Sequence, residues 1–313
     1  MKYKILASEK FEIPEPLQET VTIDVFDDLW RDETVLATTA KGYDALIVRN
    51  MTQVNSNLLE QLKSIKVIGR LGAGTENIDV DYANQCHIPI VYAPLQNTNA
   101  VAEFCVAQVF NAFRHLPDAI HEAKQGVWNR EKYLSTGREI SGCNVGVIGF
   151  GNIGKAFTQK MDALGANVLI YNRTPSNVTA AFHHTDLVNL LKSSDIISIH
   201  LPGGDKTKNF LHEGNIGLIK RGAFLMNSSR GGVVNETALL AALESGQLSG
   251  AMIDVRTVEP AYADALARHP NVYPTPHIAA FTLESQTAIS ESVVMDIIRV
   301  LQNKSPQYPV PVR

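Results

Sequence analysis

Three side chains that could hold an anion or move a proton follow apolar segments in the last third of the chain. Arg230 follows "AFLMNSS" and precedes two glycines, Glu259 follows "GAMIDVRTV", and His277 follows "NVYPTP". An arginine fork can hold a carboxylate, and a histidine with a carboxylate partner can give or take a proton. Each residue alone could equally be a surface arginine, a loop acid or a packed histidine. Together, in this order, they suit hydride exchange at a 2-hydroxy or 2-oxo acid.

A glycine-rich turn precedes these residues along the chain. The segment "NVGVIGFGNIG" places Gly149, Gly151 and Gly154 after an apolar run and at the start of a helix-compatible segment. In this pattern the first glycine permits a tight turn, the second lets a pyrophosphate approach the backbone, and the third lets helix and strand pack closely. The helix would begin with Asn152 and Ile153, and its N-terminus would offer N–H groups to the phosphates. We therefore predict a dinucleotide site here.

The next apolar run, "NVLIYNRT", indicates which dinucleotide binds. An Asp or Glu at the tip of this strand would accept hydrogen bonds from the adenosine ribose and would repel a 2′-phosphate. Asn172 occupies that place, 18 residues after Gly154, and Arg173 and Thr174 add a guanidinium and a hydroxyl group. The alternative is a solvated arginine in a polar loop. Because the acid is lost and a base is gained together, the sequence favours NADP(H) over NAD(H).

Two series of short apolar runs must position these groups. The first comprises "KYKIL", "VTIDVF", "ALIVRN", "IKVIGRLG" and "IPIVYAP", and the second "NVGVIGF", "NVLIYNR", "DIISIHLP", "AFLMNSS", "GAMIDVR" and "NVYPTPHI". Runs of about four to eight residues with helical segments between them are typical of parallel strands in βαβ units. The chain is therefore predicted to form two α/β units in tandem. We expect a connecting helix over 98–127 and a last helix over about 284–303 that returns to the first unit.

Length and composition exclude several classes of protein. At 313 residues the chain is long for one core, which favours two domains. The net charge of −4 gives no reason to expect nucleic acid or an anionic membrane as a partner. The sequence contains neither a signal-peptide core nor an uncharged apolar stretch of about 18 residues, so no membrane span is expected. The three cysteines are odd in number without C-x-x-C spacing, which predicts reduced thiols in the cytoplasm. No metal site is predicted.

Over nearly its whole length the chain resembles the NAD(P)-dependent D-isomer-specific 2-hydroxyacid dehydrogenases. The motifs "GFGNIG", "HLPGGDKT", "NSSRG", "DVRTVEP" and "TPHIA" occur in the order and spacing of that family. The resemblance implies an α/β protein with two Rossmann-like, doubly wound parallel-sheet domains and an active-site cleft between them. Residues 1–97 and 284–313 would form the substrate domain, and residues 98–283 the dinucleotide-binding domain.

The resemblance also implies roles for particular residues. Arg230 would grip the carboxylate and carbonyl of the substrate, His277 would be the general acid/base, and Glu259 would hold and tune the histidine. The residues that would line the NAD(P) site are, on the adenine and ribose side, His200, Leu201, Pro202 and Thr207 and, at the nicotinamide end, Ser228 and Asp254.

Two N-terminal motifs also match the family. "IVRNMT" would bring Arg49 and Asn50 to the substrate from the end of a strand. "RLGAGTENID" is a glycine-rich turn whose N–H groups could cradle the substrate carboxylate. The N–H groups concerned are those of Ala73, Gly74 and Thr75. The alternative for both motifs is a strand-end turn with solvated basic residues.

Several alternatives remain at this point. Arg49 and Arg70 match basic positions in the phosphoglycerate dehydrogenase branch, where they would meet a substrate phosphate, whereas Arg173 favours an NADPH-dependent glyoxylate or hydroxypyruvate reductase. Outside the enzymes, a dinucleotide-sensing corepressor-like binding protein shares the implied fold. The helix after Thr98 has apolar residues on more than one side, which predicts a homodimer.

Overall fold

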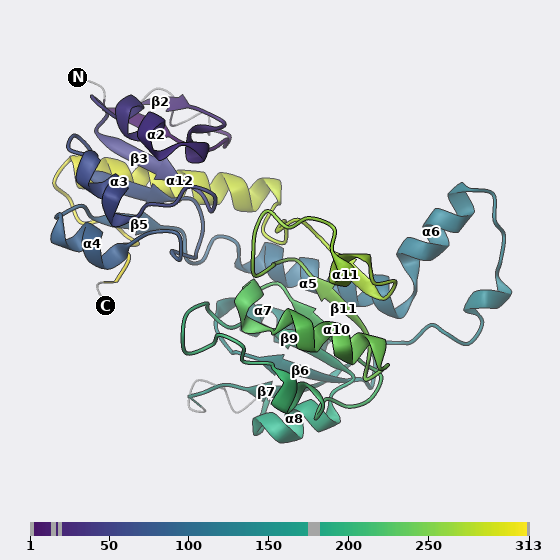
Figure 1. Cartoon of the computed structure of the whole chain (residues 1–313). Coiled ribbons are helices and arrows are strands. Elements are labelled where there is room, and N and C mark those ends of the chain that lie inside the picture. The colour runs from purple at the N-terminus through teal and green to yellow at the C-terminus, as the bar shows by residue number, and fades with distance from the viewer. Residues whose placement is uncertain (1–2, 14–16, 18–20, 175–181, 312–313) are drawn as a thin grey trace. The chain divides into compact units, whose positions relative to one another are not determined.

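The described part of the chain forms two compact units. The computed structural model describes residues 3–13, 17, 21–174 and 182–311. The first unit comprises residues 1–97 and 281–313, and the second comprises residues 98–280. Each unit has a parallel sheet with helices, which confirms the predicted fold class (Figure 1).

The first unit contains a five-stranded sheet with the order β2-β1-β3-β4-β5. All five apolar runs predicted as strands form strands. Their bounds are Lys4–Ala7 (β1), Thr22–Val25 (β2), Ala45–Val48 (β3), Val67–Arg70 (β4) and Ile90–Tyr92 (β5). The helices of this unit whose bounds the structure describes are η1 (Leu29–Arg31), α2 (Glu33–Thr39), α3 (Ser56–Gln61), α4 (Val80–Gln85) and α12 (Leu283–Leu301).

Alternate residues of these strands face two separate cores. Leu46 and Val48 of β3 pack with α2, α3 and α4, whereas Ile47 packs on the other face with α12. On that second face Gly69 of β4 allows α12 to lie close, because a Cβ atom there would be 2.6 Å from Val293. The last helix therefore packs on the first unit, as expected. Its bounds lie within two residues of those predicted.

The second unit contains a seven-stranded sheet with the order β12-β11-β10-β9-β6-β7-β8. The six predicted strands are β6 (Asn144–Ile148), β7 (Asn167–Tyr171), β9 (Ile196–Ile199), β10 (Ala223–Asn227), β11 (Leu248–Ile253) and β12 (Val272–Pro274). The short edge strand β8 (His183–His184) was not predicted. The main helices are α5 (Thr98–Phe113), α6 (Leu116–Lys124), α7 (Asn152–Ala163), α8 (Leu187–Ser193), α9 (Glu213–Ile216), α10 (Glu236–Glu244) and α11 (Ala265–Arg268).

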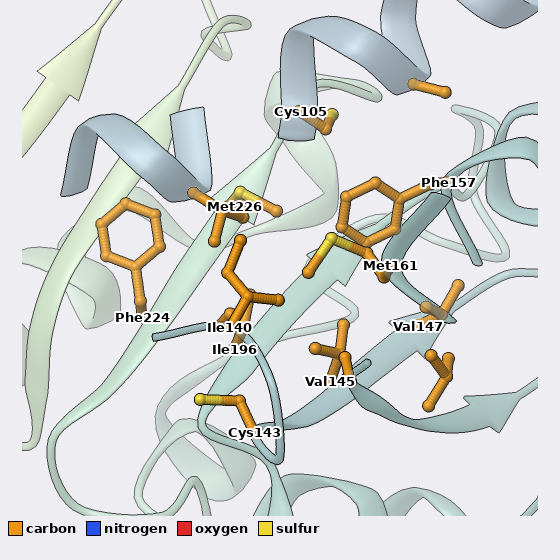
Figure 2. Close-up of a cluster of buried hydrophobic side chains, with 14 of the residues drawn as sticks. Cys105, Ile140, Cys143, Val145, Val147, Phe157, Met161, Ile196, Phe224 and Met226 are labelled. Atoms are coloured by element: carbon orange, nitrogen blue, oxygen red, sulfur yellow. The ribbon is translucent and has the colours of Figure 1, made fainter. Parts of the chain in front are cut away.

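Two cores also enclose this sheet, one on each face. On one face Val145 and Val147 of β6 pack under α5 and α7, with Phe157 and Met161 of α7 fully buried above them (Figure 2). On the other face Ile148 belongs to a cluster with α8 and α10. Because helices cover both faces, the strands are apolar on both sides, which explains the continuous runs in the sequence.

The connecting segment differs from its prediction. A single helix over 98–127 is wrong, because α5 ends at Phe113 and α6 begins at Leu116. His115 takes a left-handed conformation with φ of 51°, and Pro117 lies in the first turn of α6. A proline inside one continuous helix would remove a hydrogen bond and clash with the preceding turn, so the chain ends one helix and begins another.

The residues after this break project from the second unit. We call residues 116–134, which contain α6 and η2 (Glu131–Tyr133), the arm (Figure 1). None of the residues of α6 is buried. Among the residues that the structure describes, no helix has the length and apolar character needed to cross a membrane.

Candidate active site

The predicted site residues of the second unit follow the carboxyl ends of its parallel strands. Strand β6 lies between β7 and β9, so the chain runs to one side of β6 and then crosses to the other. Ligands of open α/β sheets bind at such a topological switch point. The segments that follow these strand ends are 149–154 after β6, 172–174 after β7, 200–207 after β9, 228–230 after β10, 254–259 after β11 and 275–277 after β12.

The local geometry explains why glycine occupies each of the three positions in the turn after β6, and the explanation differs for each. Gly149 has φ of 96°, and a Cβ atom on it would lie 2.5 Å from the carbonyl oxygen of His200. A Cβ atom on Gly154 would overlap the carbonyl oxygen of Gly149, so this glycine permits close packing of α7. A Cβ atom on Gly151 would meet nothing within 4 Å, so this backbone is open to an approaching group.

The first turn of α7 completes this phosphate cradle. Gly151 is the N-cap residue and supplies no side-chain cap, and Asn152 and Ile153 begin the helix. The first N–H groups of a helix have no partner within it, and they attract anions. The turn therefore fits a pyrophosphate group, as the sequence predicts.

His200 supports the cradle from below. Its imidazole accepts or donates a 2.9 Å hydrogen bond with the hydroxyl of Ser198, and its ring centre lies 5.3 Å from that of Phe157. Burial lowers the pKa of His200 to about 4, so the ring is neutral at neutral pH. The side chain thus packs beside Phe157, and the backbone carbonyl of His200 lies next to Gly149 of the cradle.

The tip of β7 joins the cradle through Asn172. Its Oδ1 atom accepts a 3.2 Å hydrogen bond from the N–H of Phe150, and its Nδ2 atom donates to the carbonyl of Thr174 at 2.9 Å. Arg173 and Thr174 are exposed. The amide of Asn172 therefore fixes the tip beside the glycine turn, and the neighbouring Arg173 is exposed.

The three proposed catalytic residues follow neighbouring strands, β10, β11 and β12. Nδ1 of His277 lies 2.7 Å from Oε2 of Glu259. Arg230 donates a 2.7 Å hydrogen bond from Nη1 to the carbonyl of Ser229, and its charge acts on Glu259. The structure therefore brings the predicted histidine, carboxylate and arginine into one group.

Glu259 is held as an anion. Burial alone raises the pKa of its carboxyl group, but the hydrogen bond and charge of His277 lower it. The N–H of Arg256 and the charge of Arg230 lower it further, so that the pKa of Glu259 lies below its ordinary value. The carboxylate is consequently ionised at neutral pH and can fix the imidazole ring.

Asp254 fixes the turn that carries His277. This carboxylate is buried and accepts hydrogen bonds from the hydroxyl of Thr275 (2.7 Å), the N–H of Ile278 (2.8 Å) and the N–H of Ala279 (2.9 Å). Residues on both sides of His277 are therefore anchored to the end of β11. His277 itself adopts φ of 58°.

The remaining predicted cofactor residues of this unit also follow the carboxyl ends of strands in the same sheet. Leu201 is partly buried against the core and Pro202 is exposed. Thr207 donates from its hydroxyl to the carbonyl of Pro202 at 2.7 Å, which closes the loop after β9. The hydroxyl of Ser228 lies 3.1 Å from the sulfur of Cys105 on α5.

In the first unit, Arg49 and Asn50 begin the loop after β3. The carboxylate of Glu9, buried at the end of β1, accepts bonds from the N–H groups of Arg49 (2.9 Å), Met51 (3.2 Å) and Thr52 (3.0 Å). β1 and β3 flank the topological switch point of this sheet. Glu9 was not predicted as a site residue, because a lone acid after a strand carries no spacing signal.

The guanidinium of Arg49 has partners inside the first unit. It donates to the carbonyl of Lys10 at 3.2 Å and to Oε1 of Gln286 at 2.9 Å, and it lies over the ring of Phe281. Burial lowers the pKa of Arg49 from its ordinary value, and the nearby charge of Glu9 opposes this shift.

The glycine-rich turn after β4 fits an anion. The backbone N–H groups of Ala73, Gly74 and Thr75 have no hydrogen-bond partner among the described residues. The guanidinium of Arg70 folds over this turn, because a Cβ atom on Gly72 would overlap it. The turn thus combines three N–H groups with a nearby positive charge.

The second unit matches the family model described as "D-isomer specific 2-hydroxyacid dehydrogenase, NAD binding domain" over residues 106–279, more than half of the chain. The chain belongs to the D-isomer specific 2-hydroxyacid dehydrogenase family. The matched range includes the glycine cradle and all three proposed catalytic residues, and it assigns NAD binding to this part of the chain.

Individual members of this family are similar to the chain over most of its length. The D-3-phosphoglycerate dehydrogenase of Bacillus subtilis is 33% identical over 95% of this chain and 57% of its own length. That of Archaeoglobus fulgidus is 37% identical over 82% of this chain and 49% of its own length. The chain therefore spans about half the length of these curated relatives.

Solved structures of the family have the same fold. An NADPH-dependent glyoxylate/hydroxypyruvate reductase from Sinorhizobium meliloti, in complex with NADP and malonate, has a TM-score of 0.88 and is 26% identical. The match covers 99% of this chain and 97% of that one.

Two of the three glycines of the cradle, Gly151 and Gly154, should respond differently to alanine. Gly151→Ala should leave the free energy of unfolding nearly unchanged but weaken dinucleotide binding about tenfold or more, because the methyl group enters the open face of the turn. Gly154→Ala should cost about 1–3 kcal/mol of stability, because its methyl group overlaps the Gly149 carbonyl. Fluorescence titration with NADH and NADPH, and chemical denaturation, measure the two effects. Wild-type dinucleotide affinity in Gly151→Ala would contradict the assignment.

Proposed function

We propose that this chain is an oxidoreductase that interconverts a small D-2-hydroxy acid and its 2-oxo acid with NAD(P)(H). The observation that carries the proposal is the 2.7 Å contact between His277 and Glu259, beside the charge of Arg230. Membership of the family, and an anion cradle on the same sheet edge, support it.

In this proposal the bound nicotinamide supplies or accepts a hydride, and the chain orients and protonates the substrate. His277 uses Nε2, the ring nitrogen that does not face Glu259, to give a proton to the carbonyl oxygen in reduction and to take it back in oxidation. Glu259 holds the ring in one orientation. Arg230 binds the carboxylate and polarises the carbonyl, so the residues act by orientation and electrostatics.

The substrate we favour carries no phosphate, as glyoxylate and hydroxypyruvate do not. Arg49 would have to give up its bonds to Lys10 and Gln286 before it could meet a phosphate. In the proposal the N–H groups of residues 73–75, in the first unit, bind the substrate carboxylate. A second candidate is a phosphoglycerate dehydrogenase-like activity, favoured by Arg70 over this turn and by the names of the curated relatives.

We propose NADP(H) as the preferred dinucleotide. Asn172 uses its amide to fix the tip of β7, so no carboxylate stands there to repel a 2′-phosphate. Arg173 is exposed beside it and can supply a charge-assisted contact. The similar reductase from Sinorhizobium meliloti is NADPH-dependent.

We further propose a cytoplasmic homodimer. The residues of α5 on which the sequence prediction rested are mostly used inside the second unit, where Val101 is buried and Phe104 packs against the core. The arm is the better candidate for a two-fold contact, because Ile120, Trp128 and Leu134 are 53%, 84% and 78% exposed. Light scattering should therefore give twice the mass of the chain. The three cysteines are unpaired, which suits a reducing compartment.

A screen of 2-oxo acids tests the proposed reaction. Wild-type protein should oxidise NAD(P)H with glyoxylate or hydroxypyruvate faster than with 3-phosphohydroxypyruvate, and the reverse order would favour the second candidate.

His277→Ala should lower kcat by roughly 10²–10⁴ with dinucleotide affinity retained, because the proton donor is lost. Arg230→Lys keeps the charge but loses the planar fork, so KM for the acid should rise. Dinucleotide binding without turnover of any acid would instead support a dinucleotide-sensing protein.

The cofactor preference has its own test. Wild type should favour NADP(H) by roughly ten- to hundredfold in kcat/KM, equivalent to about 1.5–3 kcal/mol from a charge-assisted contact. Asn172→Asp with Arg173→Ala should reverse the order, because a carboxylate repels the 2′-phosphate and accepts the ribose hydroxyls. High salt should narrow the wild-type preference. Equal kcat/KM for the two cofactors in wild type would mean that Arg173 is only a solvated loop residue.

A further inference from the structure

The loop that carries Glu259 is anchored by an arginine that the reaction itself does not use. Arg256 lies between β11 and α11, and its side chain is only 10% exposed. Its Nη2 atom lies 2.8 Å from Oε2 of Glu236, the first residue of α10, and 2.5 Å from Oδ2 of Asp264, the N-cap residue of α11. One guanidinium thus ties the loop to the beginnings of two helices.

Both carboxylates hold the loop as anions. Glu236 also accepts a 2.7 Å bond from the N–H of Thr257. Burial raises the pKa of Glu236, but the bonds from Arg256 and Thr257 lower it below its ordinary value. The bond from Arg256 also lowers the pKa of Asp264. The contact is therefore a partly buried network with three charges, which is worth more than an isolated surface pair.

The backbone of the same arginine orients the catalytic carboxylate. The N–H of Arg256 donates to Oε1 of Glu259 at 3.0 Å, while Oε2 of Glu259 faces Nδ1 of His277 at 2.7 Å. One oxygen is thus fixed by the loop backbone and the other meets the imidazole. A shift of Arg256 would rotate the carboxylate away from the ring.

The same backbone also contacts the turn that carries Arg230. A Cβ atom on Gly231 would overlap the backbone of Arg256 and Thr257, so the two turns lie in direct contact. Glu236 follows that turn within a few residues along the chain. The backbone of Arg256 therefore contacts both the turn that carries Arg230 and the carboxylate of Glu259.

We propose that Arg256 is a positioning residue that fixes Glu259 toward His277 through its ion pairs with Glu236 and Asp264. This inference rests on the proposed function, since it assigns Arg256 to the geometry of that reaction. The group touches neither substrate nor dinucleotide in the proposal. It acts through Glu259, and its effect should disappear when Glu259 is removed.

The first part of the test does not require the protein to turn over a substrate. Arg256→Met removes the charge but keeps an unbranched apolar stem, and Arg268→Met makes the same change at an exposed arginine at the end of α11. Hydrogen exchange measured by mass spectrometry should be about tenfold faster over 254–262 in Arg256→Met and unchanged in Arg268→Met. Arg256→Lys should lie between them, because a point charge replaces the fork. Unchanged exchange in Arg256→Met would overturn the proposal, even if the wild-type protein reduced no acid.

The second part of the test separates a positioning role of Arg256 from a general loss of structure. Arg256→Met should lower kcat about tenfold with dinucleotide affinity within twofold of wild type, because a misplaced carboxylate no longer holds His277. In a Glu259→Gln background the same change should cost less than about twofold, since the residue through which Arg256 acts is gone. A full tenfold loss in that background, or unchanged kcat despite faster exchange, would overturn the proposal. Absence of turnover in wild type would instead refute the proposed function. The hydrogen-exchange measurement alone would then decide whether Arg256 fixes the loop.

Discussion

The carboxylate of Glu259 uses its two oxygens for two different purposes, and the candidate active site depends on both. One oxygen accepts the backbone N–H of Arg256, which sets the direction of the side chain, and the other faces the imidazole of His277. A charged group bonded on both sides has little freedom to rotate, so the ring it holds is also fixed. Asp254 adds a second constraint, because it anchors the backbone on both sides of His277.

The parallel sheet of the second unit explains why residues far apart in the sequence can form this group. Each strand begins at the same edge and ends at the other, so the segments after β10, β11 and β12 lie side by side. After β8 the chain crosses to β9 on the other side of β6, and the glycine turn that follows β6 is open at this switch point. The glycine cradle and the proposed proton-transfer group therefore both follow the carboxyl ends of strands in one sheet.

The strands, the cradle and the three catalytic candidates could be predicted from the sequence, because buried parallel strands are continuous apolar runs and strand ends carry the polar groups. Local patterns did not reveal the break at His115, where apolar spacing continued although Pro117 could not remain inside a helix. The two-residue strand β8 is too short for any periodicity. Arg256 pairs with Glu236, 20 positions away, and Glu9 with residues 40 or more positions away. Such pairings are set by tertiary structure, and a single sequence contains no spacing that predicts them.

The candidate active site depends most on the anionic state of Glu259, and the pH dependence of stability measures that state directly. The pKa of Glu259 is lowered below its ordinary value of 4.5, so the stability that its carboxylate contributes is present above that pH and is lost as the pH falls through the lowered pKa. The free energy of unfolding of wild type should exceed that of Glu259→Gln by about 1–2 kcal/mol at pH 6, and this difference should shrink steadily below about pH 4.5. A difference that is absent at pH 6, or that does not change between pH 6 and pH 3.5, would contradict an ionised carboxylate held between Arg256 and His277.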